Sequence, residues 1–140
     1  MSVAANIDKS ISMQEFIKGK MIKELAKGVA SIKEYVYPSM LQSSAIPAIK
    51  KSESKNIIVK YSEMSGIKLT VMLPLLNQQI KHVVSSESDQ VVYTLVLCHT
   101  NQRCQHLTDF CNELTKFCQD VVDIVMFEQL DFQDVKHDWK

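Results

Sequence analysis

This sequence has no excess of charge of either sign and no long apolar run. Its 16 basic side chains balance 16 acidic ones, so the whole chain has no electrostatic attraction to nucleic acid, and any RNA contact has to be local. The longest apolar run, Val71 to Leu76, is far shorter than the roughly 20 residues that cross a bilayer. The first residues also lack the basic and apolar regions of a signal peptide. These absences predict an intracellular protein of the nucleus or cytoplasm.

Cysteine is scarce, and its spacing does not suit cross-linking. The chain has Cys98, Cys104, Cys111 and Cys118, of which the last three recur every seven residues in a helix-like segment. That spacing separates neighbours by about 10 Å of helical rise. Zinc ligands lie about 2.3 Å from the metal, and a disulfide needs Cα atoms within about 7 Å. We therefore expect no metal site, and reduced cysteines that pack as small apolar residues.

What is present is the composition of a globular domain, with 140 residues, 46% hydrophobic and 23% charged. Residues 1–11 read as a flexible tail, and 12–140 as one folded region. A capping box, Ser12 with Glu15, precedes apolar residues at helical spacing and predicts a helix from Met13 to Ala30.

A second helix is predicted from Ser39 to Ile46, with Pro38 before it and Pro47 interrupting it. Longer helices are predicted from Gly66 to Val83, and from a cap at Thr100 or Asn101.

Three short apolar segments predict β-strands. They span Asn56–Lys60, Val91–Cys98 and Val122–Phe127. Strands that alternate with helices form right-handed βαβ units, so the pattern predicts an α/β fold with a parallel sheet. No further strands of such a sheet are evident, so we expect bare sheet edges and self-association through Val91–Cys98.

The turn after the first predicted strand has the setting of a degenerate phosphate-binding loop. Such loops use glycines to wrap backbone N–H groups around phosphates, a lysine for the outer phosphates and a hydroxyl for Mg²⁺. This turn has one glycine, Gly66, and Lys68 follows it, but Leu69 stands where the hydroxyl is needed. In parallel sheets ligands bind beyond the carboxyl ends of strands, where the junction at Thr100 is also expected.

Five motifs occur in a fixed order along the chain. They read Pro38-Ser39-x-x-Gln42, Ala45-Ile46-Pro47-Ala48-Ile49, Ser65-Gly66-Ile67-Lys68, Gln78-Gln79 and Leu95-Val96-Leu97-Cys98-His99-Thr100. Their order and spacing resemble the first RecA-like domain of DEAD-box RNA helicases. The last motif is similar to that of the nuclear mRNA-export and splicing subfamily, whose acidic motif reads Asp-Glu-Cys-Asp. The resemblance implies a partial RecA-like, three-layer P-loop NTPase-type fold.

The resemblance also implies particular binding residues. Gln42 matches the glutamine that reads adenine, Tyr35 matches the aromatic residue before it, and Lys68 matches the phosphate-binding lysine. The implied nucleotide-binding set is Tyr35, Gln42, Ser65, Gly66 and Lys68, and the implied RNA contact is Thr100. No cofactor is certain, and ATP with Mg²⁺ is expected to bind weakly if it binds.

The sequence departs from the helicase pattern where catalysis would occur. Ile67 replaces a glycine of the phosphate loop, Leu69 removes the Mg²⁺-binding hydroxyl, and Glu128-Gln129 stand where two glycines would contact RNA. The Asp-Glu motif and the second RecA-like domain are not found. Phosphoryl transfer needs several positioned charges and of these only Lys68 remains, so we expect no catalytic residue and no hydrolysis.

Three functional hypotheses follow from these residues. The first is a catalytically silent, degenerate helicase-like module that binds a protein of the mRNA-export or splicing machinery, or competes for RNA. The second is a weak ATP- and RNA-binding helicase domain that uses Gln42 and Lys68. The third is a small α/β scaffold in which those two residues lie on the surface without an inherited role.

Overall fold

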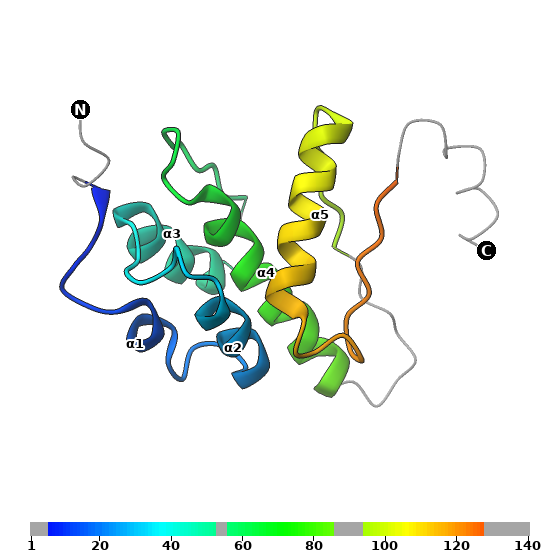
Figure 1. The fold of residues 1–140 in the computed structure, drawn as a ribbon, viewed down its shortest axis with the longest axis horizontal. Coiled ribbons are helices and arrows are strands. Elements are labelled where there is room, and N and C mark those ends of the chain that lie inside the picture. The colour runs from blue at the N-terminus through cyan, green and yellow to red at the C-terminus, as the bar shows by residue number, and fades with distance from the viewer. Residues whose placement is uncertain (1–5, 53–55, 86–93, 128–140) are drawn as a thin grey trace.

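The computed structural model describes residues 6–52, 56–85 and 94–127, and these fold into a group of packed helices (Figure 1). The helices are α1 (Met13–Ile17), α2 (Lys23–Ser31), α3 (Met40–Lys51), α4 (Ile67–Ser85) and α5 (Asn101–Thr115). Helix α3 packs against α4, and α2 packs against α5. Helix α4 also contacts α5 and therefore joins the two pairs.

The core is formed where apolar stripes of these helices meet. Leu25 and Val29 of α2, Leu69 and Leu73 of α4, and Leu114 of α5 are completely buried. Each pair on one helix is four residues apart, the spacing that places side chains on one face. The helical periodicity in the sequence predicted the buried positions of Leu25, Val29 and Leu114.

The predicted parallel sheet is wrong, and with it the α/β, RecA-like fold. The described residues contain no strand. Asn56–Lys60, residues 94–98 and Val122–Phe127 run without sheet pairing, while residues 91–93 lie outside the described part. An apolar, β-branched segment becomes a strand only when a neighbour supplies lateral hydrogen bonds, and these segments do not pair with one another.

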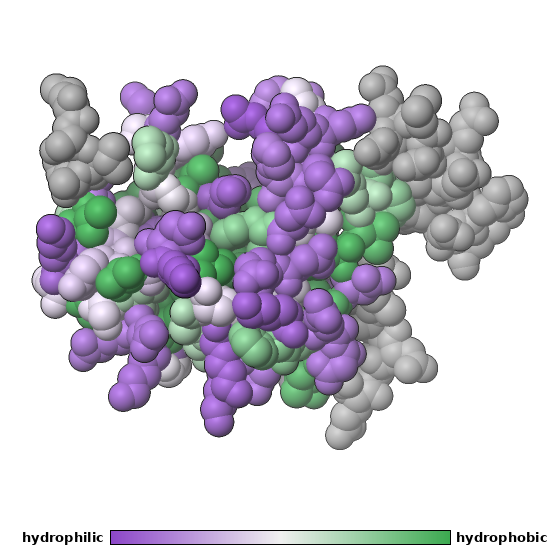
Figure 2. Space-filling model, viewed as in Figure 1, coloured by the Kyte–Doolittle hydropathy of each residue, from purple (hydrophilic) through white to green (hydrophobic). Residues whose placement is uncertain are grey.

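All three of these unpaired segments leave large apolar side chains open to solvent. Ile58 is 96% exposed, Leu95 is 73% exposed and Leu97 is 86% exposed. Val125 and Phe127 are also exposed. Figure 2 shows apolar surface beside α5, on the side where the last described residues run in Figure 1.

The predicted helix from Met13 to Ala30 is divided into α1 and α2. Gly19 has a φ of +69°, a left-handed conformation that a glycine accepts readily and a helix does not contain. The backbone N–H of Ile22 then donates to the side-chain oxygen of Asn77, 2.8 Å away, instead of to a preceding turn. A glycine and a distant polar partner together end the helix.

The predicted end of the second helix is also wrong, because α3 continues through Pro47 to Lys51 and does not stop at Ile46. The predicted caps are confirmed at Ser12 and Thr100, whose side-chain oxygens accept backbone N–H groups. Part of the predicted tail is also held, since Ile7 forms an isolated antiparallel bridge with Ser39. Within the described ranges no helix combines the length and apolar character needed to cross a membrane.

Candidate functional site

The loop before α4 is shaped by two left-handed residues. Met64 has a φ of 60° and Gly66 a φ of 78°. Between them, the N–H of Ser65 donates to the carbonyl of Ser62 at 3.3 Å, so this part of the loop is a hydrogen-bonded turn. Ser39, the N-cap residue of α3, stabilises the loop, because its hydroxyl donates to the carbonyl of Ser65 at 2.7 Å.

Gln42 lies against this loop and is 1% exposed. Its side-chain oxygen accepts the N–H of Ser39 at 2.8 Å, which completes a capping box at the start of α3. Its side-chain nitrogen donates to the carbonyl of Gly66 at 3.3 Å. Both ends of the amide are therefore used within the protein, and Gln42 connects the start of α3 to the start of α4.

Gly66 is required at its position for two reasons. Its positive φ is strained for any residue with a side chain. A Cβ atom there would also lie 3.1 Å from the amide carbon of Gln42, closer than carbon atoms normally approach. The two helicase-like motifs that contain Gln42 and Gly66 are thus brought into direct contact.

Lys68 and Tyr35 both contact Phe110, a residue for which the sequence predicted no role. The ammonium group of Lys68 lies 5.0 Å from the ring centre of Phe110 in α5, a cation–π contact. The ring of Tyr35 packs edge-on against the same Phe110, with 6.3 Å between ring centres. Burial raises the pKa of the Tyr35 hydroxyl. The only sequence signal for Phe110 was its place beside the apolar stripe of α5.

Ser65 and Thr100 have different surroundings. Ser65 is buried, and its hydroxyl has no hydrogen-bond partner in the described part of the chain. Thr100 caps α5 by accepting the N–H of Arg103 at 3.2 Å. Ten residues of helix separate Thr100 from Phe110, a rise of about 15 Å, so the predicted RNA contact lies away from the predicted nucleotide residues.

A polar cleft of about 300 Å³ lies beside the loop. Its lining includes Ser39, Ser44, Lys60, Tyr61 and Ser62. These residues supply hydroxyls and one ammonium group but no carboxylate or imidazole. The cleft therefore has donors for a polar ligand and no residue placed to act as a general base.

The cysteines are free thiols, as expected, and Cys111 and Cys118 are buried in the core. Burial, and to a smaller extent Cys98, raise the pKa of Cys111 to about 11, while Lys68 opposes the shift. A buried thiol with a raised pKa stays protonated and unreactive near neutral pH. No group of three or more metal-binding side chains is found in the described ranges.

Comparison with family models, with curated proteins and with solved structures gives no match for this chain. The resemblance to DEAD-box helicases therefore stays a prediction carried by the ordered motifs.

Proposed function

We propose that this protein is a degenerate DEAD-box helicase-like module that binds a protein of the RNA-processing or mRNA-export machinery and has no ATPase or helicase activity. The observation that carries the proposal is that the side chain of Gln42 forms two hydrogen bonds within the protein. Its amide oxygen and nitrogen bond Ser39 and Gly66, at 2.8 and 3.3 Å, so the residue expected to read adenine is instead part of the folded structure. A buried amide with satisfied partners gains little by exchanging them for a ligand.

The surroundings of Lys68 support the same proposal. Its ammonium group is held over the ring of Phe110, on α5, and Leu69 beside it is fully buried in the core. A side chain buried in the core does not supply the hydroxyl that Mg²⁺ needs. Lys68 and Leu69 thus contribute to packing between α4 and the rest of the protein.

The binding surface of the proposed module is the unpaired segment 94–98. It belongs to no helix or strand, and Leu95 and Leu97 are open to solvent. An extended partner segment gains backbone hydrogen bonds by lying beside such a chain, and alternate side chains then fill pockets on the partner. Exposed apolar side chains on an unpaired edge also favour pairing with another copy.

Calorimetric titration of ATP and Mg²⁺ into the folded protein tests whether nucleotide binds at Lys68. We expect no ATP hydrolysis and no heat that depends on Lys68, so wild type and Lys68→Ala should give the same titration. Lys33→Ala, which removes an exposed lysine outside both motifs, controls for general charge effects. An affinity between micromolar and millimolar that disappears only in Lys68→Ala would contradict the proposal and favour a nucleotide-binding domain.

Sedimentation at increasing protein concentration tests the binding segment. We expect wild type to self-associate, because open backbone groups and apolar side chains of segment 94–98 pair with those of a second copy. The double variant Leu95→Lys with Leu97→Lys should sediment as a monomer. Val84→Lys is the matched control, since Val84 is also 73% exposed but lies on α4. A wild type that stays monomeric, or a control that dissociates equally, would count against this surface.

A further inference from the structure

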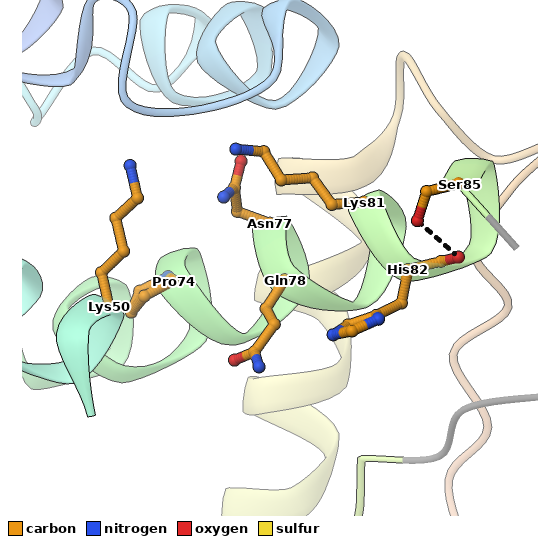
Figure 3. A pocket seen from close by; sticks show the side chains of 7 residues that line it. All are labelled: Lys50, Pro74, Asn77, Gln78, Lys81, His82 and Ser85. Atoms are coloured by element: carbon orange, nitrogen blue, oxygen red, sulfur yellow. Dashed lines mark hydrogen bonds between the residues drawn. The ribbon is translucent and has the colours of Figure 1, made fainter. Parts of the chain in front are cut away.

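A second polar cleft lies between the end of α3 and the C-terminal half of α4, and it shares no residue with the cleft beside the loop (Figure 3). Its volume is about 230 Å³. Helix α3 contributes Lys50, and α4 contributes Asn77, Lys81, Gln78 and His82. Asn77 and Lys81 are four residues apart, as are Gln78 and His82, and Figure 3 shows the two pairs extending to different sides of the helix.

Asn77 gives the cleft a hydrogen-bond donor of fixed orientation. Its side chain is 3% exposed, and its oxygen accepts the N–H of Ile22 at 2.8 Å. A backbone N–H can only donate, so this bond fixes the amide with its nitrogen turned away from Ile22. No hydrogen bond joins that nitrogen to another residue of the described chain. Among the described residues, this amide nitrogen is therefore open to a ligand in the cleft that Asn77 lines.

Two lysines bring positive charge to the cleft beside Asn77. Figure 3 shows the side chains of Lys50, Asn77 and Lys81 extending to the same side of α4. The ammonium group of Lys50 donates to the carbonyl of Lys20 at 2.7 Å and keeps further N–H groups for a ligand. Within residues 6–52, 56–85 and 94–127, no aspartate or glutamate lines the cleft. Two ammonium groups and an oriented amide donor are groups that bind an anion.

We propose that this cleft binds a single phosphate group, supplied as inorganic phosphate or as a small phosphate monoester. Its volume is below the roughly 300 to 1,000 Å³ of sites for drug-sized ligands, which favours a small group over a nucleotide. Asn77 donates to one phosphate oxygen, and Lys50 and Lys81 neutralise the charge. This site goes beyond the proposed binding module and does not depend on it.

Titration of the full chain, labelled with ¹⁵N, with inorganic phosphate tests the site. We expect the side-chain amide resonances of Asn77 to shift and saturate with a Kd on the order of 1 mM, the affinity of a few hydrogen bonds to a small anion. Sodium chloride at matched ionic strength should produce no saturable shift. Glycerol 2-phosphate distinguishes the two sources, since tighter binding than phosphate assigns the site to a monoester. Absence of a saturable shift at Asn77 would overturn the proposal.

Variants locate the binding. Asn77→Asp keeps an oxygen for the N–H of Ile22 but replaces the donor with a negative charge, so binding should weaken by about 10- to 100-fold. Lys81→Gln, at an exposed position, should weaken binding about fivefold while leaving the fold intact. Lys33→Gln removes the same charge outside the cleft and should bind as wild type does. If Lys81→Gln and Lys33→Gln lost phosphate affinity equally, the binding would reflect the overall charge of the protein and no specific site.

The proposed phosphate site and the proposed function can be tested independently of each other. Lys68→Ala leaves the cleft untouched and should bind phosphate with unchanged affinity. Asn77→Asp leaves the loop before α4 untouched and should not alter any ATP binding that depends on Lys68.

Discussion

Replacing Gly28 with alanine is expected to lower the free energy of unfolding by about 3 kcal/mol, a large part of the stability of a domain this size. Gly28 is buried in α2 where that helix crosses α5. A Cβ atom at Gly28 would lie 2.8 Å from the carbonyl carbon of Leu114 and even closer to its oxygen. These are backbone atoms, so relief requires the two helices to move apart.

The sign of this effect opposes the one that helix propensity gives. Alanine is better than glycine inside a helix by about 1 kcal/mol, so Gly28→Ala should stabilise an isolated α2. In the folded protein, separating α2 from α5 also loosens the contacts of Leu25, Val29 and Leu114, all fully buried. The loss of close packing then exceeds the gain in propensity.

Urea unfolding of wild type, Gly28→Ala and Gly19→Ala measures the difference. A Cβ atom at Gly19 would meet no other atom within 4 Å, but the residue has a φ of +69°. Gly19→Ala therefore isolates backbone strain and should cost about 1 kcal/mol. Unfolding of Gly28→Ala at the same or a higher urea concentration than wild type would show that α2 and α5 do not approach this closely.

The helices could be read from the sequence because their signals are local. The Ser12 and Thr100 caps, and the spacing of Leu25 with Val29, lie within a few turns of the residues they organise. The strands could not be read in the same way. Ile58 and Leu97 have strand-like neighbours, but a strand also needs a partner chain, and local composition does not reveal whether one is present.

The candidate sites were predictable only in part for the same reason. The motifs placed Gln42 and Gly66 in order along the chain, but the hydrogen bond between them depends on how α3 meets α4. Phe110 and Asn77 carried no motif. Their roles arise from contacts with Lys68, 42 positions before Phe110, and with Ile22, 55 positions before Asn77. A distant partner of this kind leaves no periodic trace.

Replacing Gln42 with alanine is expected to lower the free energy of unfolding by about 2 to 3 kcal/mol. The change leaves the N–H of Ser39 without its side-chain partner, removes the bond to the carbonyl of Gly66 and opens a cavity where a fully buried side chain stood. If Gln42 served only to read adenine, the same change would leave stability unaltered and weaken ATP binding. Urea unfolding and ATP calorimetry on one variant therefore separate a structural role from a ligand-binding role.

The variant Gln42→Glu separates the effects of the two hydrogen bonds that the Gln42 side chain forms. The carboxylate can still accept the N–H of Ser39, and a negative charge is favourable in the first turn of α3. It cannot donate to the carbonyl of Gly66, and it places two oxygens against each other in a buried position. We expect a loss of about 1 to 2 kcal/mol at pH 7, smaller than for Gln42→Ala.

The pH dependence of Gln42→Glu gives this assignment a second readout. Burial and the facing carbonyl raise the pKa of the introduced carboxyl above its value in the unfolded chain, because only the protonated form can donate to Gly66. The folded state then holds the proton more tightly, so the bond contributes fully at pH values below the unfolded pKa of about 4.3 and is lost as pH rises through the folded pKa. Unfolding measured at pH 4 and pH 7 should therefore show the deficit relative to wild type shrinking at pH 4. A deficit that is the same at both values would mean that the Gly66 contact does not stabilise the junction of α3 and α4.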